Sequence, residues 1–173
     1  MQKVILVNEA DEIIGSMEKL EAHKKGVLHR AFSIFIFNNS GELLLQRRAL
    51  EKYHSGGLWT NTCCSHPSPI EDTLKAAENR LVEEMGFRAK LQFLFSFIYQ
   101  TNFPNGLIEH ELDHVFVGHY NGPVTINREE AMDYQWMSYK ALQEATIQYP
   151  QKFTFWFLKI YEKVMRQHNI TDK

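Results

Sequence analysis

The feature that most constrains the fold of this chain is a helix pattern at residues 69–85, which stands between two groups of strand patterns. Ser68 is the predicted N-cap, Pro69 the first helical residue and Glu71 the partner in a capping box. Gly86 is expected to end the helix. One side of the helix is predicted to be an apolar face of Leu74, Ala77, Leu81 and Met85.

Strand patterns flank this helix on both sides. A buried strand is predicted at residues 31–37, where apolar residues follow one another almost without interruption, and a turn at 38–41 leads into a strand at 42–47. The other predicted strands cover residues 4–7, 13–15, 91–99, 107–120 and 133–137, and two further helices cover 18–25 and 151–167. Mixed strands around a central helix predict one domain of the α/β or α+β class.

Composition narrows the possible function classes. A length of 173 residues and an apolar share of 44% suit one globular domain. A net charge of −2 argues against nucleic acid as a partner, and no apolar run reaches the roughly 20 residues of a membrane span. The two cysteines are neighbours, so they cannot link distant segments, and the early polar residues do not fit a signal peptide. We therefore expect a cytoplasmic protein that does not bind membranes.

The segment 60–67 carries a thiol and an imidazole on one face. In an extended chain, Cys64 and His66 point to the same side and Cys63 to the opposite side. The neighbouring residues are polar and turn-forming, which is not typical of a core. The pattern predicts that Cys64 and His66 belong to a site and that Cys63 packs inside the protein.

Farther along the chain, Glu109 and Glu111 form a second pair with the spacing of one strand face. Alternating charges on a strand often face solvent, which is the simple alternative for this pair. Two carboxylates near a loop that contains histidine are also hard ligands for a divalent metal ion. Together with Cys64 and His66, they favour a metal-assisted active site.

Helical geometry separates two adjacent glutamates. Glu83 points away from the apolar face and is predicted to be solvated, whereas Glu84 lies at the flank of that face. Glu84 could therefore reach a metal ion or a phosphate, or simply pair with Arg80 one turn earlier. The basic cluster that includes Arg48 and Lys52 indicates either an anionic phosphate substrate or solubilising charge.

These motifs resemble the type I isopentenyl-diphosphate isomerases, a family of the Nudix-fold superfamily. The resemblance covers nearly the whole chain, and its most specific parts are the cysteine motif and the acidic motif. Against the Nudix signature, Ser65 stands at the first glycine position, and Asn79 and Arg80 replace an Arg-Glu pair. The chain therefore lacks one metal-binding carboxylate of the Nudix hydrolases, which weakens diphosphate hydrolysis as the alternative function.

The resemblance implies a single domain over residues 1–173, with a mixed sheet packed between helices. The implied reaction interconverts isopentenyl and dimethylallyl diphosphate by protonation to a tertiary carbocation and loss of a neighbouring proton. The implied cofactors are Mg²⁺ on the diphosphate and one tightly bound Mn²⁺, Zn²⁺ or Mg²⁺ ion. The implied partner is the small prenyl diphosphate, and the chain is expected to be a monomer or weak homo-oligomer. A non-enzymatic metal-binding domain is a third alternative, which no sequence feature favours.

Carried over residue by residue, the resemblance also implies a site. The catalytic residues would be Cys64, Glu111 and Tyr99, with a Cys64 thiolate suited to act as a base. The implied metal ligands are His23, His29, His66, Glu109 and Glu111. The implied diphosphate contacts are Lys19, Arg48, Lys52 and Arg80, while Glu84 and the backbone carbonyl of Cys64 would hold Mg²⁺. Trp156 would place an aromatic face over the hydrocarbon end. Which of Cys64 and Glu111 gives the first proton stays open.

Overall fold

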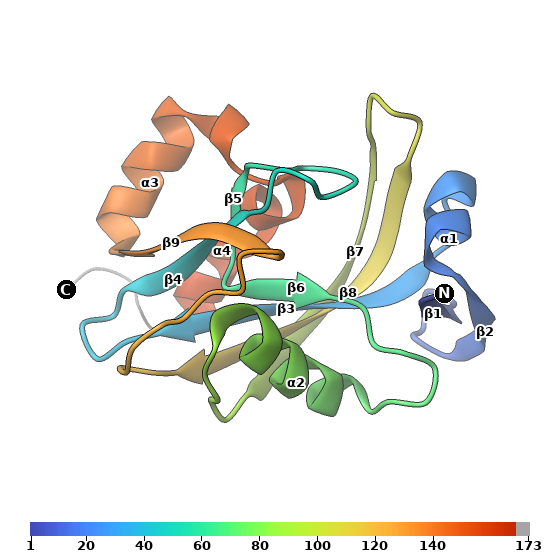
Figure 1. Cartoon of the computed structure of the whole chain (residues 1–173), viewed down its shortest axis with the longest axis horizontal. Helices are drawn as coiled ribbons and strands as arrows, with labels where there is room; N and C mark the ends of the chain where they lie inside the picture. The colour runs from blue at the N-terminus through green and yellow to red at the C-terminus, as the bar shows by residue number, and fades with distance from the viewer. Residues whose placement is uncertain (169–173) are drawn as a thin grey trace.

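The long apolar run of the sequence forms the central strand of the fold. In the computed structural model, which describes residues 1–168, this run is strand β3 (His29–Phe37), and all of its residues except Arg30 are buried. It pairs in parallel with β8 (Ile108–His119) and antiparallel with β1 (Lys3–Val7), β4 (Leu43–Arg48) and β6 (Cys63–Ser65). Strand β3 therefore brings segments that are distant in the chain side by side (Figure 1).

The remaining elements extend and cover this sheet. Strand β7 (Gln92–Asn102) pairs with β8, β2 (Ile13–Glu18) pairs with β1, and β4 also carries β5 (Trp59–Thr60) and β9 (Ala131–Met137). The helices are α1 (Lys19–Lys25), α2 (Thr73–Met85), α3 (Tyr139–Gln148), the 3-10 helix η1 (Pro150–Lys152) and α4 (Phe155–Gln167). This mixed arrangement confirms the predicted α+β class. Within residues 1–168, no helix is long and apolar enough to cross a membrane.

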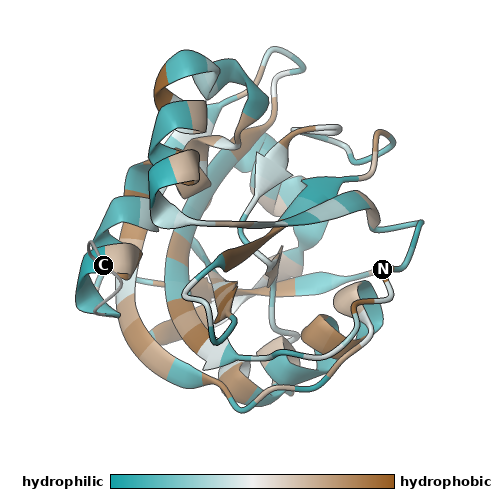
Figure 2. Cartoon of the chain, turned by 90° about the vertical axis from the view of Figure 1, so that its left-hand side faces the viewer, coloured by the Kyte–Doolittle hydropathy of each residue, from teal (hydrophilic) through white to brown (hydrophobic). Residues whose placement is uncertain are grey.

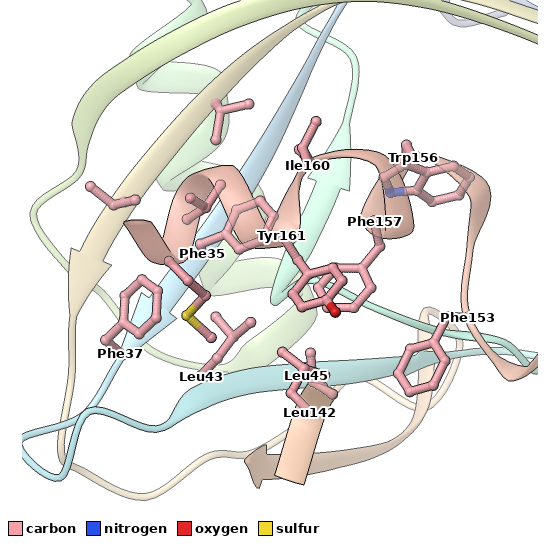
Figure 3. Packing of buried hydrophobic residues seen from close by; sticks show 14 of the residues in the cluster. Phe35, Phe37, Leu43, Leu45, Leu142, Phe153, Trp156, Phe157, Ile160 and Tyr161 are labelled. Carbon is pink, nitrogen blue, oxygen red and sulfur yellow. The ribbon is translucent and has the colours of Figure 1, made fainter. Parts of the chain in front are cut away.

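Two apolar cores lie on the two faces of the sheet. Because side chains alternate along a strand, Phe35 of β3 packs into the first core, with Phe157 and Tyr161 of α4 (Figure 3). The neighbouring residues Phe32 and Ile34 pack into the second core, against α2. Full burial of one such side chain contributes about 2 kcal/mol. In Figure 2 the hydrophobic segments accordingly run through the interior along the long strands.

Helix α1 is short and depends on its caps and on its contact with β8. The Glu18 carboxylate accepts hydrogen bonds of 3.1 and 2.9 Å from two backbone N–H groups of the first turn. Gly26 ends the helix with a φ of +66°, and a Cβ there would lie 3.0 Å from Ile108, so both the backbone and the available space require glycine. The Nδ1 atom of His110 lies 3.0 Å from the Gly26 carbonyl oxygen. These contacts join α1 to the sheet beside the site described below.

The predicted start of the central helix is wrong. The helix begins at Thr73, and Asp72 is its N-cap, with a carboxylate that accepts a backbone N–H bond of 3.1 Å. Ser68 instead donates its hydroxyl hydrogen to Glu71 at 2.9 Å. This hydrogen bond closes a separate turn before the helix, so Pro69 lies in that turn rather than at the first helical position.

Other differences from the predicted elements have local causes. Leu74, predicted on the apolar face, is 38% exposed, because α2 turns Ala76 toward the sheet instead. The C-terminal helix begins at Phe155 rather than at residue 151, since η1 interrupts the chain before it. The sequence pattern does not predict α3, in which polar residues are as numerous as apolar ones. Its one clear signal is Ser138, whose hydroxyl caps the helix by accepting the Ala141 N–H at 3.2 Å.

Candidate active site

The register of neighbouring strands places three site residues in one row across the sheet. Glu111 on β8 stands opposite Tyr99 on β7 and opposite His29 on β3. The Tyr99 hydroxyl donates a hydrogen bond of 2.7 Å to the Glu111 carboxylate. Glu109 shares the strand face of Glu111, and each residue is only 4% exposed. This burial excludes the alternative of a solvated sheet face.

Three imidazoles converge on Glu111. Its Oε1 atom lies 2.8 Å from Nε2 of His66, 3.5 Å from Nε2 of His29 and 3.9 Å from Nε2 of His23. The Nδ1 atoms of His23 and His29 lie 2.7 and 2.8 Å from backbone carbonyl oxygens. Because a carbonyl oxygen only accepts, these two rings carry their hydrogen on Nδ1 and direct the Nε2 lone pair toward the centre.

The convergence has the spacing of a metal centre. Ligand atoms lie within 4.8 Å of one another in a group of His23, His29, His66 and Glu111. Glu109 belongs to a second group of the same spacing, with His23 and His54. The buried Oε2 atom of Glu109 has no hydrogen-bond partner among residues 1–168, as expected for a group that a further ligand completes. Four of the predicted ligands therefore lie in one group. The fifth, Glu109, lies in a second group that shares His23 with the first.

The pKa values of the two carboxyl groups are shifted in opposite directions. Burial, together with repulsion from Glu111, raises the pKa of Glu109 well above its usual range. Burial alone would also raise the pKa of Glu111, but the contact with His66 reverses this effect and holds that pKa well below its usual range. Burial lowers the pKa of His66 to about 3 despite the nearby Glu111 carboxylate. The His66 ring is therefore neutral and supports the Glu111 carboxylate as a hydrogen-bond donor.

The two adjacent cysteines face different environments. Cys63 packs in the core covered by α2, and its thiol lies 3.3 Å from a Glu84 carboxylate oxygen. Cys64 is half-buried and faces the pocket. Burial raises the pKa of Cys64 to about 12, although the Arg48 guanidinium, 3.7 Å from its sulfur, opposes the change. In the ligand-free protein Cys64 is thus a neutral thiol, which corrects the expectation of a thiolate base.

One pocket joins these groups. Its volume is about 130 Å³, close to the roughly 150 Å³ of an engineered cavity that binds benzene. The predicted site residues that line it are Lys19, Arg48, Lys52, Cys64, His66, Arg80, Glu84, Tyr99, Glu109, Glu111 and Trp156. Cationic, acidic, thiol and aromatic groups therefore meet in one pocket.

Two of the basic side chains of the pocket, Arg80 and Lys52, contact carboxylates. Arg80 contacts Glu84 one turn later on α2, which is the helix pair that the sequence offered as an alternative to a metal or phosphate contact of Glu84. Arg80 also lies 3.2 Å from Glu130. Lys52 also contacts Glu130. Glu84 is only 3% exposed and lines the pocket, while Glu83 is exposed, which confirms the predicted geometry of α2.

Three residues in or beside the pocket were not found by the sequence analysis: Tyr53 and His54, which line it, and the buried Asp113. His54 is 6% exposed, and burial together with Arg48 lowers its pKa to about 3. The Tyr53 hydroxyl lies 3.3 Å from Nε2 of His23. Asp113 lies two residues beyond Glu111 on the same strand face and is almost fully buried. Strand alternation could have indicated Asp113, whereas His54 and Tyr53 lie in a loop without a periodic pattern.

The same chain matches known proteins over most of its length. A sequence model of the NUDIX domain matches residues 27–157. An isopentenyl-diphosphate Delta-isomerase from Serratia proteamaculans is 53% identical over 159 residues, which cover 92% of this chain and 89% of that protein. Isopentenyl-diphosphate Delta-isomerase 2 from Aromatoleum aromaticum is 48% identical over 163 residues, which cover 94% of this chain and 86% of that protein.

Solved structures show the same fold at lower sequence identity. DR0079 from Deinococcus radiodurans superposes with a TM-score of 0.70 at 18% identity, covering 85% of this chain and 90% of that one. A MutT protein from Methanosarcina mazei gives a TM-score of 0.67 at 18% identity, covering 82% and 95%. The structural likeness supports the Nudix fold. This chain therefore belongs to the isopentenyl-diphosphate Delta-isomerase family of Nudix-fold proteins.

Proposed function

We propose that this protein interconverts isopentenyl and dimethylallyl diphosphate by protonation and deprotonation through a tertiary carbocation. The observation that carries the proposal is the meeting of Cys64, Tyr99 and Glu111 in a pocket that also contains four cationic side chains. The names of the relatives supply the substrate class. The reaction would take place within the single domain of residues 1–173.

The chemistry requires an acid and a base around one substrate. No carbonyl group activates the C–H bond of the substrate, so direct deprotonation is not feasible near neutral pH. Protonation of the terminal alkene carbon gives a tertiary carbocation, from which a neighbouring proton is lost easily. Cys64 and Glu111, the latter bonded to Tyr99, are the proposed proton-transfer groups. In the ligand-free protein Cys64 is a thiol and Glu111 a carboxylate, so one group holds a proton and the other can accept one.

The proposed ligands of one tightly bound Mn²⁺, Zn²⁺ or Mg²⁺ ion are His23, His29, His66, Glu109 and Glu111. A bound divalent ion would make a proton on its Glu111 ligand more acidic. Support comes from the Nε2 lone pairs that His23 and His29 direct toward the centre and from the oxygen of Glu109 that has no hydrogen-bond partner within residues 1–168. Imidazole and carboxylate ligands together suit these three ions.

The diphosphate end would be bound by the cationic side chains of the pocket, Lys19, Arg48, Lys52 and Arg80. Glu84 and the backbone carbonyl of Cys64 would hold a Mg²⁺ ion on the diphosphate. In the ligand-free structure Glu130 contacts both Lys52 and Arg80, so the substrate has to replace these contacts. Binding energy from the diphosphate is remote from the reacting carbons and can be used to orient them.

Trp156 is the proposed aromatic face for the cationic intermediate. It is 2% exposed, and its indole N–H donates a hydrogen bond of 3.2 Å to Asn61, which fixes the ring. The guanidinium of Arg48 lies 5.3 Å from the ring centroid, so the ring already contacts a cation. A desolvated cation over such a ring is stabilised by roughly 2 kcal/mol.

One assay separates isomerisation from diphosphate hydrolysis and from simple metal binding. The purified protein is incubated with isopentenyl diphosphate and Mg²⁺, and the products are followed by NMR. We expect the dimethylallyl isomer to accumulate without release of phosphate. Released phosphate would indicate the hydrolase alternative, and an unchanged substrate would contradict both enzymatic functions.

The two glutamates at the end of α2 provide a matched pair of variants. Glu84→Gln should raise the Mg²⁺ and substrate concentrations needed for half-maximal rate far more than Glu83→Gln does, because Glu84 lines the pocket and Glu83 is exposed. Steady-state kinetics at varied Mg²⁺ would measure both requirements. A larger loss in Glu83→Gln would refute the role of Glu84.

The proposal includes a cytoplasmic location and a monomer or weak homo-oligomer. Cys63 and Cys64 are free thiols, which agrees with a reducing compartment. The proposed partner is the small prenyl diphosphate, with no role for nucleic acid or membrane.

A further inference from the structure

We infer that His54 is a positioning residue of the proposed metal centre. His54 lies beside one oxygen of Glu109 and orients this side chain so that the other oxygen faces the ion. The inference rests on the proposed metal centre and adds to it a residue that has no role in the proposed reaction. His54 lies in the loop between β4 and β5, and its side chain lines the pocket.

Glu109 is the least satisfied carboxylate of the pocket. Glu111 is held by the Tyr99 hydroxyl and by His66, at 2.7 and 2.8 Å. In Glu109, Oε1 lies 3.7 Å from Nε2 of His54, and Oε2 has no hydrogen-bond partner within residues 1–168. The two oxygens therefore differ, with one beside an imidazole and the other free to bind an ion.

The His54 ring is fixed in the orientation that this role needs. Its face stacks on Phe103 at 4.5 Å with an interplanar angle of 11°, and Tyr53 packs edge-on at 4.5 Å. The Ser55 hydroxyl lies 3.2 Å from Nδ1. If that hydroxyl donates to Nδ1, the ring carries its hydrogen on Nε2, the atom that points at Glu109. In this tautomer Nδ1 accepts a hydrogen bond from Ser55, and the Nε2 hydrogen faces Glu109 at 3.7 Å, a distance longer than a hydrogen bond.

The group of His23, His54 and Glu109 shares His23 with the group around Glu111. His23 can serve only one ion, because its Nδ1 already contacts the Lys19 carbonyl oxygen at 2.7 Å and only Nε2 is free. The two groups therefore describe one centre rather than two. Hydrogen-bonded partners of ligating carboxylates tune such centres, and their loss lowers metal affinity by about 10- to 100-fold.

A double-mutant cycle on metal affinity tests this role without substrate. Wild type, His54→Ala, Glu109→Gln and the double variant are stripped with chelator and titrated with Mn²⁺, and free Mn²⁺ is measured by electron paramagnetic resonance. We expect His54→Ala to bind Mn²⁺ about 10- to 100-fold more weakly than wild type. In the Glu109→Gln background, His54→Ala should cause no further loss, since His54 acts through Glu109.

Two further variants keep the test decisive if His54→Ala folds poorly. His54→Gln retains an N–H donor of similar reach and should recover most of the affinity. His119→Ala should bind Mn²⁺ like wild type, because His119 contacts His168 outside the pocket. The inference about His54, but not the metal centre, would be overturned by either of two results. His54→Ala could bind Mn²⁺ as tightly as wild type, or the substitution could cause the same loss of affinity in the Glu109→Gln background as in wild type. Failure of wild type to bind Mn²⁺ tightly would overturn the metal centre as well.

Discussion

Cys64→Ala is expected to lower the isomerisation rate by about 10²- to 10⁴-fold, the range typical of a lost proton-transfer group, or to abolish it. Cys64 faces the pocket and holds a proton in the ligand-free protein, because burial raises its pKa to about 12. No other thiol lines the pocket within residues 1–168. The rate would be measured with isopentenyl diphosphate at saturating Mg²⁺.

Cys63→Ala is the matched control for this variant. Cys63 belongs to the core covered by α2, and its alanine variant should largely keep the isomerase activity. A modest loss of stability, about 1 kcal/mol, is expected because the thiol contact with Glu84 disappears. Equal losses of activity in both variants, with folding intact by circular dichroism, would reject the assignment of Cys64.

Glu109→Gln and His66→Ala are expected to purify with markedly less transition metal than wild type. Each substitution removes one ligand from the proposed centre and leaves the remaining ligands incompletely satisfied. Both variants should also melt at a lower temperature, because an ion that binds only the folded state stabilises it. At an ion concentration 100 times the dissociation constant, this stabilisation is about 2.7 kcal/mol. Elemental analysis of protein purified without chelator and a thermal melt would measure the two effects.

Variants remote from the pocket complete this experiment. His119 and His168 lie 3.2 Å apart through their Nε2 atoms and do not line the pocket. His119→Ala and His168→Ala should therefore keep the metal content and the melting temperature of wild type. A full metal complement in Glu109→Gln and His66→Ala would refute the centre, even if isomerisation were observed.

Local periodicity explains what could be predicted from the sequence. The alternation that places Cys64 apart from Cys63, and Glu109 with Glu111, needs only an extended backbone. The exposure of Glu83 and the burial of Glu84 follow from the pitch of α2. The start of α2 could not be predicted as reliably, because Ser68 and Asp72 both have side chains that can cap a helix. Ser68 closes a separate turn before the helix, and Asp72 is the N-cap.

Features that depend on strand register and loop packing were outside the reach of the sequence. The parallel pairing of β3 with β8 sets His29 beside Glu111, although nothing in either segment specifies that register. The pKa of Cys64 depends on burial by distant segments, so the expected thiolate was wrong. His54 lacked a periodic signal because it lies in the loop between β4 and β5. Its ring stacks on Phe103 of the β7–β8 loop, a contact between two loops that are distant in the sequence.

The position of α1 divides the proposed site between two parts of the chain. The NUDIX match begins at residue 27, so β1, β2 and α1 precede the matched range. Yet α1 carries Lys19 and His23, and its end is anchored to β8 through Gly26 and His110. A fragment limited to the matched range would therefore lack two residues of the proposed site.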